Sequence, residues 1–151
     1  MIEINNLTPY LIDEEFLKKF CRKILKNEKK KEAQLSIAFI NQKEIKKLNK
    51  KYLGKDIVTD VLAFPKTEDL PRTIKLKKFQ KMDILGEVII CPHKVNKNAK
   101  QFNVTFENEL SRVLIHGILH LLGFNHGKSA REAKKMNEKE NYYLSYFNGK
   151  K

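Results

Sequence analysis

Residues 105–127, TFENELSRVLIHGILHLLGFNHG, are an apolar, helix-patterned segment that contains three of the chain's four histidines. Thr105 is a typical N-cap residue at its start, and Gly123 tolerates the left-handed conformation that ends a helix. Between these two residues, apolar positions recur with a helical period and gather on one side: Leu110, Val113, Leu114, Gly117, Ile118 and Leu121. The pattern predicts a buried helix over residues 106–122, against which other elements pack.

Two of the histidines, His116 and His120, are four residues apart and therefore lie on one face of this helix, away from its apolar side. Because Gly123 ends the helix, the chain can turn back and bring His126 toward the same point. Three histidines leave one tetrahedral position of a metal ion open, which is the arrangement of catalytic zinc sites. The alternative interpretation is three unrelated polar residues that lie close together by chance.

The residue after the first histidine distinguishes this helix from that of metallopeptidases. Their H-E-x-x-H pattern places a general-base glutamate there, whereas this chain has Gly117. A water activated by zinc has a pKa of about 7, so attack on a phosphodiester does not strictly need that base. The pattern therefore favours a nucleic-acid substrate over a peptide.

The other segments predict a mixed fold. Short apolar runs indicate strands at residues 2–5, 35–40, 61–64 and 84–91, and capping residues with helical periodicity indicate helices at 13–27, 42–52, 92–102 and 129–147. In the helix at 92–102 we expect Phe102 on the inner face. Residues 66–82 lack periodicity and predict a mobile excursion. We expect an α/β fold of the α+β type, with a small mixed four-stranded sheet packed against about five or six helices in a single domain, 1–151.

Composition limits the class of protein. No apolar run reaches the length of a transmembrane helix, and the first residues lack the pattern of a signal peptide. Cys21 and Cys91 form no Cys-x-x-Cys pair, which fits a reducing compartment, so we expect a cytoplasmic protein with no membrane partner. The 31 Lys and Arg residues against 18 Asp and Glu give a net charge of +13. Such a charge attracts polyanions, most commonly nucleic acid. The alternative explanation is that lysine-rich, solvated helix faces only keep the protein soluble.

Three segments together resemble one known family. HGILHLLGFNHG is similar to the H-G-x-L-H-L-x-G-x-D-H signature of the YbeY family, KYLGKDIVTDVLAFP to its Y-R-x-x-D-x-P-T-D-V-L-S-F-P segment, and ILGEVII to its L-G-D-I-x-I strand. The resemblance implies a zincin-like metal helix and one Zn²⁺, or another divalent transition metal, bound by His116, His120 and His126. It also implies a single-strand-specific, metal-dependent endoribonuclease in ribosomal RNA maturation and ribosome quality control. The implied partners are ribosomal RNA and the small ribosomal subunit.

The chain departs from the family pattern where the family's arginine, linked to RNA cleavage, falls at Leu53. Arg112 lies one turn before His116 on nearly the same helix face. It is a candidate to hold a substrate phosphate in place of the missing cation, and the alternative is an ordinary surface arginine. Glu109 is a second catalytic candidate on that face. It lies roughly 10 Å from His116 along the axis, so it would act only through bridging water, and its alternative role is an exposed helix charge.

Further candidates surround the predicted strand at 61–64. Asp60 is a third catalytic candidate, on the cleft wall, and Thr59, Lys51 and Lys55 are candidates for contacts to RNA. A solvated capping role is the alternative for Asp60 and Thr59. Two other functions stay open: a zincin-like metallopeptidase or other hydrolase, and a non-catalytic ribosome assembly factor with a structural metal. Gly117 and the charge argue against the first, and Leu53 keeps the second open.

Overall fold

The computed structural model of the chain describes residues 1–66, 84–127 and 129–148, and those ranges contain one four-stranded sheet and five helices. In chain order the elements are β1 Ile2–Asn6, α1 Glu14–Asn27, β2 Gln34–Phe39, α2 Gln42–Leu53, β3 Val61–Pro65, β4 Ile84–Ile90, α3 Pro92–Phe102, α4 Phe106–Leu121 and α5 Ala130–Asn148. This arrangement confirms the predicted α/β fold with a small mixed sheet. The predicted excursion at 66–82 lies, apart from Lys66, outside the described residues.

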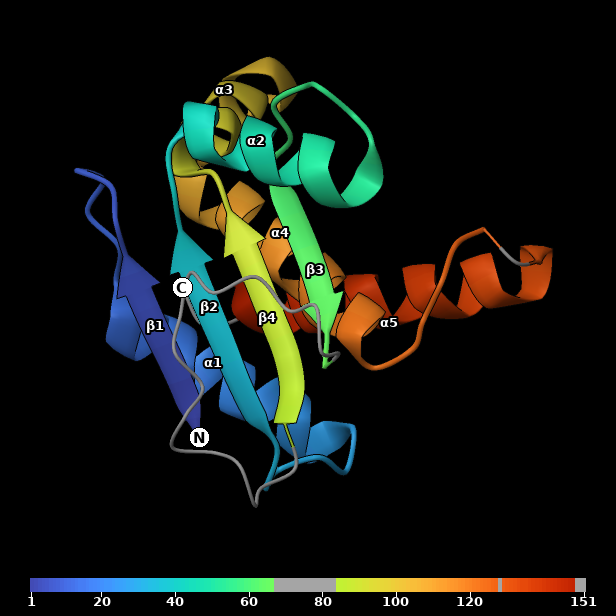
Figure 1. The fold of residues 1–151 in the computed structure, drawn as a ribbon. Helices are drawn as coiled ribbons and strands as arrows, with labels where there is room; N and C mark the ends of the chain where they lie inside the picture. The colour runs from blue at the N-terminus through green and yellow to red at the C-terminus, as the bar shows by residue number, and fades with distance from the viewer. Residues whose placement is uncertain (67–83, 128, 149–151) are drawn as a thin grey trace.

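The sheet has the strand order β1-β2-β4-β3. β1, β2 and β4 run parallel, and β3 pairs antiparallel with β4, from Val61 opposite Ile90 to Pro65 opposite Gly86. Figure 1 shows α1 and α4 behind the sheet and α2 across the upper ends of the strands. As an edge strand that also packs against α4, β3 places the segment before it, residues 54–60, next to that helix.

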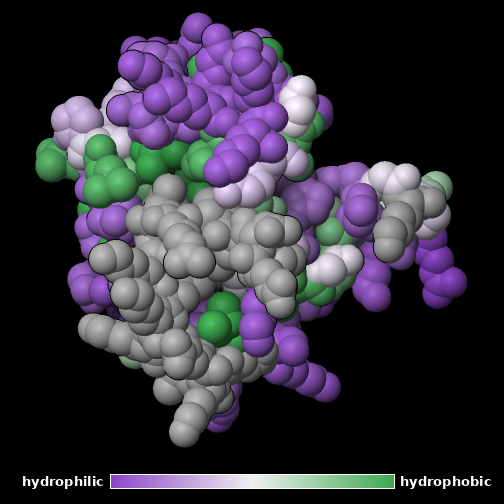
Figure 2. Space-filling model, in the orientation of Figure 1, coloured by the Kyte–Doolittle hydropathy of each residue, from purple (hydrophilic) through white to green (hydrophobic). Residues whose placement is uncertain are grey.

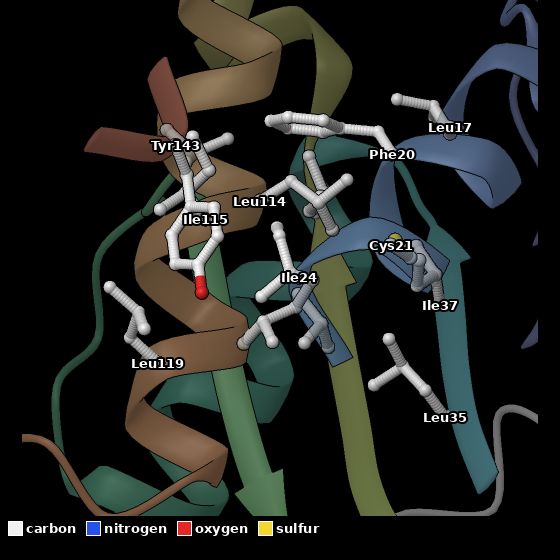
Figure 3. Close-up of a cluster of buried hydrophobic side chains, with 14 of the residues drawn as sticks. Leu17, Phe20, Cys21, Ile24, Leu35, Ile37, Leu114, Ile115, Leu119 and Tyr143 are labelled. Carbon is white, nitrogen blue, oxygen red and sulfur yellow. The ribbon is translucent and has the colours of Figure 1, made fainter. Parts of the chain in front are cut away.

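Alternation along the central strands divides the core between the two faces of the sheet. Val88 and Ile90 of β4 join the main cluster, to which α1, α4 and α5 contribute, whereas Ile89 and Cys91 join a smaller cluster beside Ile45 of α2. Figure 3 shows part of the main cluster, with side chains from α1, β2, α4 and α5 packed together. A fully buried aliphatic or aromatic side chain contributes about 1.5–3 kcal/mol, so this cluster fixes α4 firmly against the sheet.

α4 is buried on nearly every side. Between Glu109 and Leu121 all of its residues are buried except Arg112, His116 and His120. These three residues are spaced by four and therefore form one line along the helix. The packing of α4 thus leaves a single polar stripe, which ends at two of the predicted metal ligands.

Two sequence-based expectations concern the surface. The prediction that Phe102 packs inward is wrong: Phe102 is 55% exposed, because α3 ends there and Asn103 takes the left-handed conformation that turns the chain toward α4. Within the described residues, none of the helices combines the length and the apolar character that a membrane span requires.

Candidate metal centre and cleft

The end of α4 brings the third histidine back toward the first two. Gly123 has a φ of 98°, and its N–H donates to the carbonyl of His120 at 3.0 Å, while the N–H of Phe124 donates to the carbonyl of Leu119 at 3.0 Å. The side chain of Asn125 then accepts a hydrogen bond of 2.7 Å from the N–H of Gly127, which closes a tight turn around His126. Asparagine therefore supplies the turn acceptor where the family pattern has aspartate.

The three histidines form a compact cluster. One ring nitrogen from each of His116, His120 and His126 lies within 4.8 Å of the others, and all three side chains are partly exposed. The Nε2 atoms of His116 and His120 are 2.9 Å apart. Two ligands about 2.0–2.1 Å from a tetrahedral ion stand roughly 3.3 Å apart, so a small adjustment fits this pair to Zn²⁺. The cluster is able to hold a metal ion.

Glu140 of α5 supports two of these histidines. Its Oε2 lies 2.7 Å from Nδ1 of His116, and its Oε1 lies 3.2 Å from Nε2 of His126. Because a carboxylate accepts hydrogen bonds, Nδ1 of His116 carries the proton, which leaves Nε2 of that ring as the donor atom for a metal. Asn137, one turn earlier on α5, places Oδ1 3.0 Å from Nε2 of His126.

The electrostatic surroundings of His120 suit a role as a metal ligand. Burial, followed by repulsion from His116 and His126, lowers the pKa of His120, although Glu140 and a hydrogen bond with the backbone of Phe124 oppose the shift. A lower pKa favours the neutral imidazole, which is the form that binds a metal.

Gly117 occupies the position that metallopeptidases give to glutamate, and the packing explains why it is glycine. A Cβ atom built at residue 117 would lie 2.9 Å from Cγ1 of Val88 and 3.3 Å from Cγ2 of Val61. Val88 is fully buried and β-branched, so its methyl groups have little freedom to move aside. The helix meets the sheet so closely at this point that even a Cβ atom would require Val88 or the backbone to shift.

A cavity of about 660 Å³ opens beside the histidines. One wall is α4, with Arg112, His116 and His120, and the opposite wall is the segment between α2 and β3. Hydrogen bonds fix that segment: Nδ2 of the buried Asn49 donates to the carbonyl of Ile57 at 3.1 Å, and the backbone N–H of Cys91 donates to the carbonyl of Asp60 at 2.9 Å.

Several predicted site residues meet in this cavity. Lys55, Thr59, Asp60 and Arg112 line it together with His116 and His120. Lys51 does not line it; its ammonium group lies 5.3 Å from the ring centroid of Tyr52.

Glu109 differs most from expectation. Neither alternative, an exposed helix charge or a group that reaches the histidines through water, matches its position: it is a buried residue, 1% exposed, whose carboxylate binds Arg112. The reason is that α3 and α5 as well as the sheet pack around α4, so this helix has no broad solvent face.

The sequence-based site omitted Glu140 and Asn137. Met136 and Glu140 are four residues apart on α5, and Met136 is fully buried, which fixes the rotation of α5. That spacing of four residues was the available signal for a functional face on α5.

The chain is similar to known proteins in sequence and in fold. The family described as endoribonuclease YbeY matches residues 3–148. Endoribonuclease YbeY of Thermodesulfovibrio yellowstonii is 47% identical over 111 residues, which cover 74% of this chain and 65% of that protein. Endoribonuclease YbeY of Thermotoga maritima is 39% identical over 113 residues, which cover 75% and 67%. The chain thus spans just under two thirds of the first relative's length and about two thirds of the second's.

A solved structure agrees with the fold. The solution structure of a Thermotoga maritima protein superposes with a TM-score of 0.66 at 36% identity, over 95% of this chain and 87% of that one. Together with the match over residues 3–148, these similarities show that the chain belongs to the endoribonuclease YbeY family.

Proposed function

We propose that this protein is a metal-dependent endoribonuclease that cleaves single-stranded RNA in ribosomal RNA maturation and ribosome quality control. The observation that carries the proposal is the cluster of His116, His120 and His126 at the end of a polar stripe, with two of its members on the wall of a cavity. The family to which the chain belongs, described as an endoribonuclease, gives the reaction class.

The proposed metal is Zn²⁺, one ion per chain, held by His116, His120 and His126. Nitrogen ligands and a three-histidine set with an open position suit zinc, although other divalent transition metals also bind imidazole. When bound, the metal lowers the pKa of a coordinated water to about 7 and so supplies a nucleophile at neutral pH. Glu140 holds the proton at Nδ1 of His116 and thereby orients that ring.

The other chain residues bind and orient RNA in this proposal. Lys55 and Thr59 on the cavity wall contact the sugar–phosphate backbone. Lys51, a further candidate for such a contact, lies on the last turn of α2, next to the cavity-lining residues Asn49 and Leu53. Hydrophilic side chains dominate the upper part of the molecule in Figure 2, where Figure 1 shows α2 and α3. α2 carries five lysines and one glutamate, and α3 carries three lysines and no acidic residue. This excess of positive charge attracts phosphate groups toward the cavity.

We further propose that the protein acts in the cytoplasm on ribosomal RNA and associates with the small ribosomal subunit. The buried free thiols of Cys21 and Cys91 support a reducing compartment. A peptidase function is disfavoured, because Gly117 packs against Val88 where the general-base glutamate would stand.

The test is cleavage by the zinc-reconstituted full chain. The substrates are an end-labelled single-stranded fragment of ribosomal RNA, the same fragment as a duplex, and casein. We expect cleavage of the single strand alone. His120→Ala should abolish it, while His93→Ala, which changes the fourth histidine, near Tyr10 and outside the cluster, should not.

The proposal fails if fully metal-loaded protein leaves all RNA intact, and binding to the ribosomal subunit without cleavage would then favour the assembly-factor function. Hydrolysis of casein would favour the peptidase.

A further inference from the structure

Arg112 lies on the polar stripe of α4, one turn before His116, and on the wall of the cavity. Four residues of α-helix separate the two positions, which is about 6 Å along the axis. Its side chain is 41% exposed. It also lies near enough to the histidine cluster for Glu140 to contribute to raising the pKa of Arg112.

A buried carboxylate holds this guanidinium in place. Nε of Arg112 donates to Oε1 of Glu109 at 2.9 Å and Nη2 donates to Oε2 at 2.6 Å, and the side chain of Glu109 is only 2% exposed. Two parallel hydrogen bonds of this kind fix the plane of the guanidinium. The same contact, ahead of all other causes, raises the pKa of Arg112, so the charge is permanent.

The side of the guanidinium that faces away from Glu109 has weaker contacts. Oδ2 of Asp60 lies 3.9 Å from Nη2, which is an ion pair but too long for a hydrogen bond. Asp60 also accepts a long contact of 3.4 Å from Nδ2 of Asn98. Among the described residues, Nη1 of Arg112 has no hydrogen-bond partner, so the fork keeps donors that can turn to an anion in the cavity.

We infer that Arg112 binds a phosphate group of single-stranded RNA beside the metal centre, and that Glu109 is a positioning residue that aims it. The inference rests on the proposed function for the identity of the anion. A planar guanidinium matches two oxygens of a phosphate better than an ammonium does. Lys55 and Thr59 line the same cavity and complete a site for the RNA backbone.

The first experiment measures RNA binding without metal, so that it does not depend on cleavage. A fluorescent single-stranded oligonucleotide is titrated into chelator-treated protein at several salt concentrations. We expect Arg112→Gln to weaken binding at least about tenfold, because charge-assisted hydrogen bonds are lost. The slope of log K against log salt should become shallower by about 0.7, because one phosphate contact is lost.

The controls separate a phosphate contact from a loss of charge or of fold. Arg22→Gln makes the same change at an exposed position of α1 and should alter binding little. Arg112→Gln leaves Glu109 buried without its partner and so threatens folding. The double variant Arg112→Gln with Glu109→Gln removes both charges and should reproduce the weaker, less salt-dependent binding in a folded protein.

The positioning role of Glu109 predicts a different result. Glu109→Gln keeps the charge of Arg112, so the salt slope and the zinc content should remain those of the wild type. The kcat for cleavage should fall at least about tenfold, because the guanidinium is no longer held at one angle to the reacting phosphate. An unchanged kcat would overturn this role.

The outcomes distinguish the inference from the function on which it rests. If the double variant binds RNA with the same affinity and salt slope as Arg22→Gln, the inference about Arg112 is wrong, whether or not the wild type cleaves. If the double variant shows the predicted loss but the wild type cleaves no RNA, the phosphate site stands and the nuclease proposal fails.

Discussion

Replacing Glu140 by glutamine tests how the proposed metal centre is organised. The carboxylate contacts two histidines of the cluster, at 2.7 Å to His116 and 3.2 Å to His126. Glutamine keeps the shape of the side chain but has one oxygen and one amide nitrogen. Only one histidine can therefore keep an acceptor, while the other faces an N–H donor.

The size of the effect follows from these contacts. Loss of a group that orients a metal-binding histidine lowers metal affinity by about 10–100-fold, or about 1.4–2.7 kcal/mol. The side chains of Glu140 and His116 are 17% and 28% exposed, so water screens the contact only in part. Because glutamine retains one of the two contacts, we expect the zinc dissociation constant to rise within that range and not above it.

Competition with a chromophoric zinc chelator at pH 7.5 measures the dissociation constants of the wild type and of Glu140→Gln. Glu138→Gln is the matched control, since it makes the same change at an exposed position of the same helix. Nitrogen NMR of the histidine rings would show, in addition, whether His116 loses its preference for a proton on Nδ1. Equal zinc affinity in Glu140→Gln and Glu138→Gln would refute the idea that Glu140 organises the ligands.

Three other outcomes are expected. In the Arg112→Gln background, Leu53→Arg should raise kcat/KM on a single-stranded oligonucleotide at least about tenfold, because Leu53 is 56% exposed and lines the same cavity; no gain would mean that position 53 cannot reach the substrate. Since burial lowers the pKa of His120, the folded state disfavours its protonation, so thermal denaturation of the metal-free protein should show stability falling as the pH drops below about 6.5, and less so in His120→Gln. Burial raises the pKa of the Cys21 thiol to about 12, so iodoacetamide followed by mass spectrometry should find neither Cys21 nor Cys91 alkylated until the protein is unfolded.

The sequence predicted those parts of the site that depend on local patterns. Apolar periodicity, the cap at Thr105 and the stop at Gly123 are properties of one continuous segment. They were sufficient to predict that His126 lies close to His116 and His120. The backbone N–H of Asn108 donates to Oγ1 of Thr105, and the N–H of Gly123 donates to the carbonyl of His120, which confirms the predicted ends of α4.

Long-range packing determined what the sequence could not predict. Glu140 reaches His116 across 24 positions. Helical periodicity predicts which side of α5 is apolar, but it does not predict which residue of α4 that side meets. Glu109 seemed exposed because one apolar side was assigned to α4, whereas neighbours cover this helix nearly all round. The strand order β1-β2-β4-β3 is likewise a choice among several arrangements compatible with the same apolar runs.

The close approach of α4 to the sheet at Gly117 also bears on how such sites evolve. A peptidase with the H-E-x-x-H pattern has glutamate at this position, where this protein has glycine. A side chain added there would meet the methyl groups of Val88 and Val61. Gaining the glutamate would require the helix to move outward or the strands beneath it to change first, and either step disturbs the core before any new activity appears. The packing beneath Gly117 is therefore a structural obstacle to exchanging glycine for glutamate in a helix that keeps the same pair of histidines.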